Sequence, residues 1–501
     1  MPRKLYLHLP ITQLIQLQTA VVYLQSAAIY SKEDLIINGN GTLNVNAGYR
    51  NGIKSTDDCI IVSGTLNITS TEDGIIGKDL CGVVAGDINI NAGSDGIKST
   101  YDTDTTKGNV IIEGGNITIK ASNDGIQAEN ILVINDGTIN IKTNNGAADT
   151  TQTHTDNMYM GRGVFGFNNN KTTTTTDDTV ESRKGIKAGN MLIINDGDIT
   201  IDSDDDSVHC NSEIYIYGGT INAATGDDGV HADDLLTVNG GTINITQCYE
   251  GIEADDIVIN DGDISVVSSD DGINSSDGSI TINGGNLLIN ASGDGLDTNG
   301  SIIINGGYIV VLGPTSDGDT AIDYDDSCTI NGGTVMAFGS SGMLEIPKGA
   351  SNGTCIVTAF TSVSGGSKYT LSDSNGNEIL SYTPSKAYAA AIVYSDKITT
   401  GNTYDITAGS TTLSIEVTSD VTSNVSSGLG KAGGMNMPGN GGSDMPNNGS
   451  SDNGMNGNSN GSMPDMSGNG APDMNGNSSG DMPNMNNGSS NGSAPQMNNR
   501  M

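Results

Sequence analysis

A short glycine-containing turn recurs about every 22 residues over the first two thirds of this 501-residue chain, and it constrains the fold more than any other feature. The turn reads Asn-Gly-Gly, Asn-Asp-Gly or a close relative, and an Asp-Gly-Ile-like motif follows it about ten residues later. Both series are interrupted by insertions at the same two places. One supersecondary unit repeated at this period predicts a stack of similar coils.

The runs that flank each turn alternate apolar and polar residues, which predicts strands whose apolar side chains face inward. A single coil cannot bury its own apolar residues, so the coils must stack about 4.8 Å apart and share backbone hydrogen bonds. Glycine at the corners would allow the positive φ angles of tight turns. Aromatic residues make up only 4 % of the chain, so the core must consist of Ile, Val and Leu. The chain is therefore predicted to be all-β, with a right-handed parallel β-helix of about twelve coils.

The repeat also predicts the domain boundaries. We expect the β-helix over residues 27–345 and a small C-terminal β-domain, which would cap the open end of the helix, over residues 346–421. Residues 422–501 are rich in Gly, Asn, Ser and Met and are predicted to be a disordered tail. Residues 1–26 read as an atypical N-terminus or a poor signal-like segment, and no other stretch reaches transmembrane length.

Two further features concern cysteines and the longer insertion. Cys59 and Cys81 lie one repeat apart and should stack on adjacent coils, either as a disulfide or, the reading we favour, as two buried thiols. The insertion between Lys142 and Lys184 contains the run from Tyr159 to Phe167. That run could stack on a sugar ring, or it could simply pack its apolar side chains onto the side of the helix, which we favour.

Acidic residues fall at equal positions in successive repeats and should form vertical files. Like charges about 4.8 Å apart repel, so a file of carboxylates needs protonation, interspersed Lys or His, or a bound cation. Oxygen ligands in turns suit Ca²⁺. Alternatively, the Asp side chains bond their own backbone or merely solvate the surface. The predicted calcium ligands are Asp205, Asp206, Asp227, Asp228, Asp233, Glu250, Asp270 and Asp271.

A neighbouring file of mixed polar residues is the candidate carbohydrate-binding surface, because a flat flank of the helix offers rows of Asp, Asn, Lys and Thr to sugar hydroxyls. Its members, with one nearby aromatic residue, are Lys187, His209, His231, Glu253, Asn274 and Tyr249. The stacked histidines also suggest zinc, but no third ligand is convincing apart from nearby Cys210, so zinc is not favoured. The net charge of −38 argues against nucleic acid as a partner.

Five motifs in register carry a resemblance to a known family: residues 184–189, 205–209, 227–233, 249–253 and 270–274. They resemble the carbohydrate-binding β-helix proteins of anaerobic, plant-fibre-degrading bacteria, which are similar in fold to calcium-dependent pectate lyases. The resemblance covers roughly residues 27 to 420 and the Gly- and Met-rich tail. It implies a secreted or cell-surface protein that binds cellulose or acidic sugars such as polygalacturonate, with calcium on the helix.

Three functions remain to be separated. The favoured one is non-catalytic binding of polysaccharide, with Ca²⁺ bridging protein and uronate carboxylates. The second is a pectate-lyase-like, calcium-dependent enzyme with Lys187 as the base, which we disfavour because surrounding carboxylates should push the pKa of a lysine upward. The third is a structural surface adhesin that acts through its stacked repeats and tail.

Overall fold

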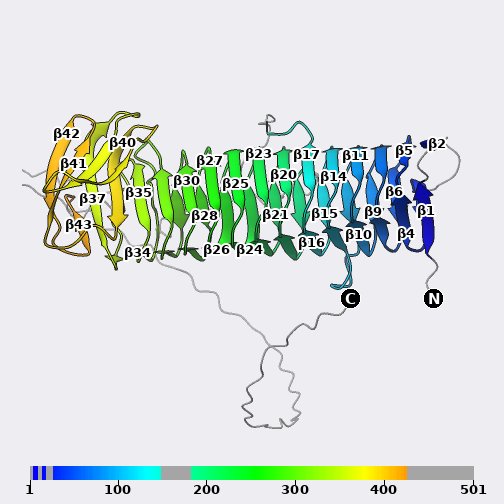
Figure 1. Cartoon of the computed structure of the whole chain (residues 1–501), viewed down its shortest axis with the longest axis horizontal. Coiled ribbons are helices and arrows are strands. Elements are labelled where there is room, and N and C mark those ends of the chain that lie inside the picture. The colour runs from blue at the N-terminus through cyan, green and yellow to red at the C-terminus, as the bar shows by residue number, and fades with distance from the viewer. Residues whose placement is uncertain (1–3, 10–13, 19–25, 148–181, 426–501) are drawn as a thin grey trace, which may run out of the picture. The chain divides into compact units, whose positions relative to one another are not determined.

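The computed structural model describes residues 4–9, 14–18, 26–147 and 182–425, and these form a parallel β-helix followed by a small β-domain (Figure 1). The described residues include no helix that is long and apolar enough to cross a membrane. The predicted disordered tail beyond residue 425 and the aromatic run from Tyr159 to Phe167 lie outside the described residues.

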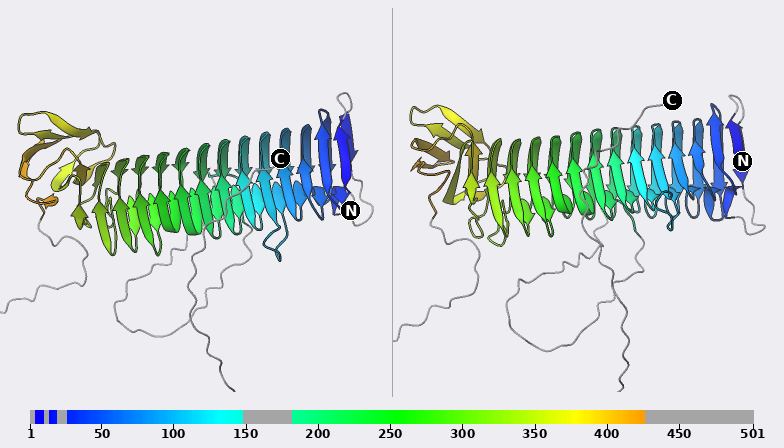
Figure 2. Two further views of the ribbon diagram at one scale, coloured as in Figure 1. Left: turned by 60° about the horizontal axis from the view of Figure 1, so that its bottom comes forward. Right: turned by 90° about the horizontal axis from the view of Figure 1, so that it is seen from below.

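Each coil contributes three strands, which stack on their counterparts to form three faces (Figures 1 and 2). The carboxylate face carries the Asp-Gly-Ile motifs. It consists of β3 (Ala27–Ser31), β6 (Asn51–Ser55), β9 (Ile75–Gly77), β12 (Ile97–Ser99), β15 (Ile126–Ala128), β18 (Ile186–Ala188), β21 (Val208–Cys210), the first parts of β24 (Val230–Val238) and β26 (Ile252–Ile259), β28 (Ile273–Ser275) and β31 (Leu296–Thr298).

The second face precedes the glycine turn. It consists of β1 (Leu5–Leu9), β4 (Leu35–Gly39), β7 (Cys59–Ile61), β10 (Leu80–Val83), β13 (Asn109–Ile112), β16 (Ile131–Ile134), β19 (Met191–Ile194), β22 (Glu213–Ile216), the second parts of β24 and β26, β29 (Ser279–Ile282), β32 (Ser301–Ile304), β34 (Ser327–Ile330) and β36 (Gly349–Ala350).

The third face follows the turn and is called the amide face here because of its outward Asn residues. It consists of β2 (Leu14–Gln18), β5 (Thr42–Ala47), β8 (Thr65–Ser70), β11 (Asp87–Ala92), β14 (Asn116–Ala121), β17 (Thr138–Thr143), β20 (Asp198–Ser203), β23 (Thr220–Thr225), β25 (Thr242–Gln247), β27 (Asp263–Val267), β30 (Asn286–Asn290), β33 (Tyr308–Leu312) and β35 (Thr334–Gly339).

The described residues thus build about thirteen coils, one more than predicted. The additional coil comes from the segment expected to be an atypical N-terminus. There β1 pairs in parallel with β4, and β2 pairs in parallel with β5. Residues Leu5 to Leu9 repeat the apolar alternation of the later coils in sequence, and Leu7 packs against the core, so this segment extends the stack even though it lacks the glycine turn.

Register is maintained from coil to coil, so identical residue types stack in the core. Ile97 pairs with Ile75 on one side and with Ile126 on the other, and all three side chains are fully buried. Burying one such side chain contributes about 1.5–3 kcal/mol. All six cysteines are free and buried, and Cys59 pairs with Cys81 in register, as predicted for stacked thiols.

Glycine serves two different purposes in each coil. At the turns it supplies positive φ, as at Gly115 (φ 108°) and Gly137 (φ 131°), in agreement with the prediction. In the Asp-Gly-Ile motif, glycine is needed because the packing leaves no room for a side chain. A Cβ on Gly125 would lie 2.5 Å from the carbonyl oxygen of Gly185 and 2.4 Å from Cγ2 of Ile141. A side chain at this position would therefore collide both with the backbone of the next coil and with the core.

The C-terminal β-domain closes the amide face at its last coil. Its strands are β37 (Thr354–Val363), β38 (Tyr369–Asp373), β39 (Glu378–Tyr382), β40 (Tyr388–Ser395), β41 (Thr403–Ala408), β42 (Thr411–Glu416) and β43 (Val421–Ser423). β40 pairs antiparallel with β35, so the exposed edge of the parallel stack is hydrogen-bonded. A second core that includes Phe338, Tyr369 and Tyr388 holds this junction together.

Candidate functional site

The mixed polar file predicted from the repeat is continuous on the carboxylate face. Lys187 pairs in register with His209, His209 with His231, and His231 with Glu253. Asn274 follows Glu253, and Asp297 follows Asn274. The vertical stacking on which the sequence reasoning depended is therefore confirmed.

The acidic file, which lies immediately before the motif glycines, has a structural function that the sequence reasoning did not identify. One carboxylate oxygen accepts a hydrogen bond from the backbone N–H of the file residue in the next coil. Asp206 Oδ1 accepts from Asp228 N at 3.1 Å, and Asp228 Oδ1 accepts from Glu250 N at 3.3 Å. Asp271 Oδ1 accepts from Asp294 N at 2.6 Å. These file carboxylates thus bond the next coil's backbone, whereas Asp205, beside the file, accepts the N–H of its own neighbour Asp206 at 2.9 Å.

The second oxygen of several file residues contacts a lysine or histidine side chain. Asp206 Oδ2 lies 2.6 Å from Nζ of Lys184 and 2.8 Å from Nδ1 of His209. Lys184 occupies the file position of the preceding coil, and its ammonium also lies 2.8 Å from Oδ1 of Asp205. His231 Nδ1 lies 3.2 Å from Asp228 Oδ2 and 3.4 Å from Glu253 Oε2. The middle of the file is therefore neutralised by the chain's own cations.

Electrostatics around Asp206 reflect this compensation. Burial by itself would raise the pKa of Asp206, but Lys184 and the two histidines outweigh it and hold the pKa well below its ordinary value. Burial would likewise lower the pKa of His231, but Asp228, Asp206 and Glu253 outweigh it and raise the pKa to about 10. His231 is therefore an imidazolium at neutral pH, and Asp206 is a carboxylate.

Acidic residues beside and beyond this compensated centre behave differently. Burial, followed by the charge of Asp228, raises the pKa of Asp227 to about 8. Burial and neighbouring carboxylates also raise the pKa of Glu250 to about 7 and that of Asp271 to about 9. Burial raises the pKa of Asp294 to about 8 even though Thr320 N–H donates to its carboxylate. These groups either hold protons or need a cation close by.

Two groups of carboxylates could hold a hard divalent cation, and one of them fits it better than the other. Asp205, Asp206 and Asp227 bring three oxygens within 4.8 Å of one another, but the Lys184 ammonium already contacts two of these carboxylates. Asp271, Asp294 and Asp297 form an equally tight group, and the charges that act most strongly on Asp271 are all acidic. The second group therefore suits Ca²⁺ better. Asp294 and Asp297 were not among the predicted ligands, although Asp294 occupies the same repeat position as Asp271 and Asp297 continues the mixed polar file after Asn274.

The remaining predicted residues lie at the margins of this face. Asp233 is half exposed, and its Oδ1 is 3.7 Å from Nε2 of His231. Tyr249 donates its backbone N–H to the carbonyl of Asp227. Asp270 donates its backbone N–H to the carbonyl of Tyr249. Lys187 donates from Nζ to Oγ of Ser182 at 3.2 Å.

Cys210 does not complete a zinc site with the two histidines. The histidine rings stack with their centroids 4.9 Å apart, but Cys210 is the next residue along β21 after His209 and faces the core. Successive side chains of a strand point to opposite faces, which separates the thiol from the imidazoles. The groups near the imidazoles are carboxylates, and these already pair with them.

Comparison with known proteins agrees with the repeat architecture. A family model described as carbohydrate-binding domain-containing protein matches this chain twice, over residues 14–229 and 227–416. A protein of Acetivibrio thermocellus described in the same words is 44 % identical over 43 residues, which is 9 % of this chain and 15 % of that protein. The alignment thus spans well under two thirds of that relative. No solved structure matches the chain.

Proposed function

Because this chain belongs to the family of carbohydrate-binding domain-containing proteins, we propose that it binds plant cell-wall polysaccharide without cleaving it, either cellulose or acidic sugars such as polygalacturonate. The observation that carries the proposal is the continuous file of polar side chains on the carboxylate face, which repeats at the spacing of the coils. An extended glycan laid along the stack meets an equivalent side chain at every coil.

Calcium forms part of the proposal. A chain with a net charge of −38 repels a uronate polymer unless a cation lies between them. Asp271, Asp294 and Asp297 would hold Ca²⁺ through carboxylate oxygens, and the ion would supply a positive charge to which a sugar carboxylate can bind. The raised pKa of Asp271 supports this, because a bound cation would relieve the same repulsion that protonation relieves.

A calcium titration with matched variants tests the metal site. The melting temperature of the purified chain should rise with Ca²⁺, and Asp271→Asn should remove most of that rise. Asp228→Ala was expected from the sequence to reduce it too, but Asp228 is paired with His231, so its effect should be smaller. Asp405→Asn, in the C-terminal β-domain, is the control and should leave the rise intact. An unchanged rise in Asp271→Asn would exclude that group as the calcium site.

Retention on insoluble cellulose and pectin, with and without a chelator, tests the polysaccharide itself. We expect retention on at least one of them, and loss of pectin retention in the chelator. Absence of retention on every polysaccharide would contradict binding and favour a structural adhesin. A steady increase in ultraviolet absorbance with polygalacturonate and Ca²⁺ would show β-elimination and replace the binding-only proposal with a lyase, for which Lys187→Met is the diagnostic variant.

We further propose that the chain acts outside the cell, at the surface or after secretion, since its polymeric ligands do not enter cells. Fractionation of the producing organism tests this, and recovery of the protein only from the soluble cell interior would contradict it.

A further inference from the structure

The amide face carries a central row of outward side chains that is uncharged in nine successive coils from β5 to β27. Register pairing aligns its members along the stack. The row consists of Asn44, Asn67, Asn89, Thr118, Asn140, Thr200, Asn222, Asn244 and Ser265. In a chain with a net charge of −38, these nine amides and hydroxyls add no negative charge of their own, and carboxylates of this face such as Asp87 and Asp198 lie beside the row, at the first residue of their strands.

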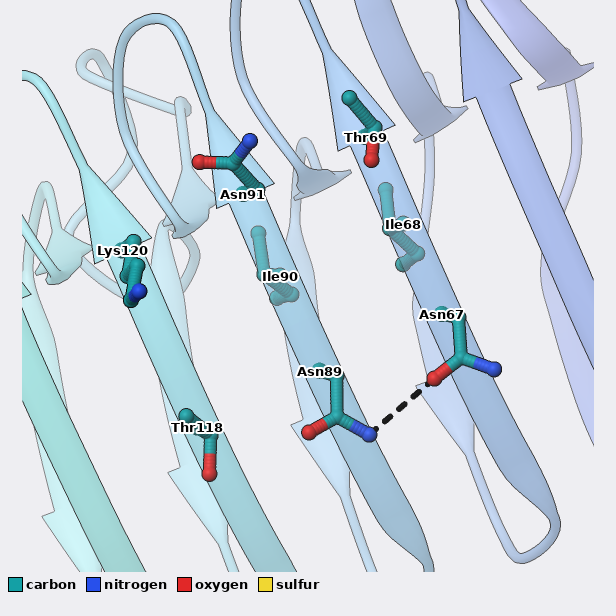
Figure 3. Close-up of a pocket in the computed structure, with 8 residues that line it drawn as sticks. All are labelled: Asn67, Ile68, Thr69, Asn89, Ile90, Asn91, Thr118 and Lys120. Carbon is teal, nitrogen blue, oxygen red and sulfur yellow. Dashed lines mark hydrogen bonds between the residues drawn. The ribbon is translucent and has the colours of Figure 1, made fainter.

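The amides in this row are already oriented by bonds to one another. Asn67 Nδ2 donates to Asn44 Oδ1 at 2.8 Å. Asn89 Nδ2 donates to Asn67 Oδ1 at 3.1 Å, the bond drawn in Figure 3. Each amide has a second N–H and a second oxygen lone pair, and these remain available for a ligand. Because the ladder fixes the rotamers, binding would immobilise little further side-chain freedom.

The amide ladder is interrupted at Thr118, and a shallow depression lies there. It has a volume of about 260 Å³ and is lined by Asn67, Thr69, Asn89, Asn91, Thr118 and Lys120, together with Ile68 and Ile90 (Figure 3). Asn89, Thr118 and Lys120 are all exposed. These three residues come from adjacent strands, β11 and β14, so a ligand in the depression runs across coils and parallel to the stack.

Lys120 is placed differently from the lysine of the next coil. Lys142, its register partner on β17, is engaged with Asp202. Among the described residues, no ion pair involves Lys120, whose ammonium is therefore available to a ligand. One cation beside a row of hydroxyl and amide groups matches the chemistry of a uronic acid residue, which presents one carboxylate and several hydroxyls.

We propose that the amide face around β8, β11 and β14 is a second glycan-binding surface, which holds an extended linear glycan through its ring hydroxyls at Asn89 and Thr118 and takes a uronate carboxylate at Lys120. This inference rests on the proposed polysaccharide-binding function and assigns a calcium-independent site to it. A linear chain of pyranoses advances by roughly one coil spacing per sugar, so successive rings meet successive coils.

Affinity measurements on the full chain in a chelator test the proposal, because the chelator removes any calcium-dependent binding at the carboxylate face. The probes are cellohexaose and an oligogalacturonate. Replacing both Asn89 and Thr118 with Ala should weaken binding of each probe by about tenfold, the equivalent of one or two lost hydrogen bonds. Lys120→Gln should weaken only the oligogalacturonate, by about fivefold.

Asn283→Ala is the matched control. Asn283 also belongs to an amide ladder, donating to Asn260 at 2.8 Å and accepting from Asn305 at 2.8 Å, but that ladder lies at the glycine turn and outside the depression. Asn283 makes two ladder bonds and Asn89 one, so the control should lose at least as much thermal stability as Asn89→Ala and keep full affinity.

The outcomes separate the two proposals. If the wild type binds in the chelator and the double variant binds equally well, the amide-face site is overturned and the proposed function stands. If the wild type binds only when Ca²⁺ is present, the amide-face site is likewise overturned and the proposed function stands. Equal loss of both probes in Lys120→Gln would overturn the assignment of the uronate carboxylate. Failure of the wild type to bind either probe under any condition would overturn both proposals.

Discussion

Replacing Lys184 with Met should destabilise the middle of the β-helix far more than a surface substitution does. The ammonium contacts Asp205 at 2.8 Å and Asp206 at 2.6 Å, and the side chains of Lys184 and Asp206 are only 15 % and 2 % exposed. Removing one partner of a buried ion pair leaves an uncompensated charge and costs about 3–5 kcal/mol. We expect the lower end of this range, because Asp206 keeps His209 and the backbone N–H of Asp228.

Hydrogen exchange is the appropriate assay, because a stacked-repeat protein opens locally and does not have one global unfolding free energy. A local loss of about 3 kcal/mol corresponds to roughly 100-fold faster exchange. Amides of β18, β21 and the first part of β24 should show this acceleration, and those of β5 and β33 should not. Lys120→Met is the control: its ammonium is exposed, so we expect a change within about 0.5 kcal/mol.

The stabilisation of Lys184→Met by calcium is a second measurement on this variant. Without the ammonium, Asp205, Asp206 and Asp227 become a group of carboxylates that a divalent cation can neutralise. Lys184→Met should therefore gain more stability from Ca²⁺ than the wild type does. Exchange rates near Asp206 that match those of Lys120→Met would refute the view that Lys184 neutralises the acidic file.

Three further predictions concern protons, packing and thiols. Burial raises the pKa of Asp271 to about 9, and neighbouring carboxylates raise the pKa of His231 to about 10. The folded chain therefore binds more protons than the unfolded chain between about pH 6 and 9. Stability in a chelator should therefore fall as pH rises, by at least about 2 °C in melting temperature, and a rise would contradict this assignment. Gly125→Ala should cost about 1–3 kcal/mol because its Cβ meets the next coil, whereas Gly48→Ala, with open space around it, should be neutral in the same melts. All six thiols are buried, so maleimide should label none in the native chain and all six after unfolding, and rapid native labelling would contradict the packed core.

The parallel β-helix could be predicted from the sequence because its coils have nearly constant length. A constant length places residues one repeat apart directly above each other, so the stacking of Lys187, His209, His231 and Glu253 followed from counting alone. The stacking of Cys59 and Cys81 followed in the same way, and their free thiols agree with the one of two readings that was favoured. The first coil was missed because β1 and β2 lack the glycine-containing turn that marks every later one.

Only the tertiary structure decided how the charges of the file are distributed. Spacing places Asp206 in a column, but side-chain rotamers determine that one oxygen accepts a backbone N–H while the other contacts Lys184 and His209. Because the second oxygen meets a lysine and a histidine, the negative charge in the middle of the file is neutralised by the chain itself, whereas Asp271 lies among other carboxylates. The depression at Thr118 was also missed. Thr118 breaks the row of Asn residues in the sequence, but whether the side chains around it leave a hollow depends on their orientation in three dimensions.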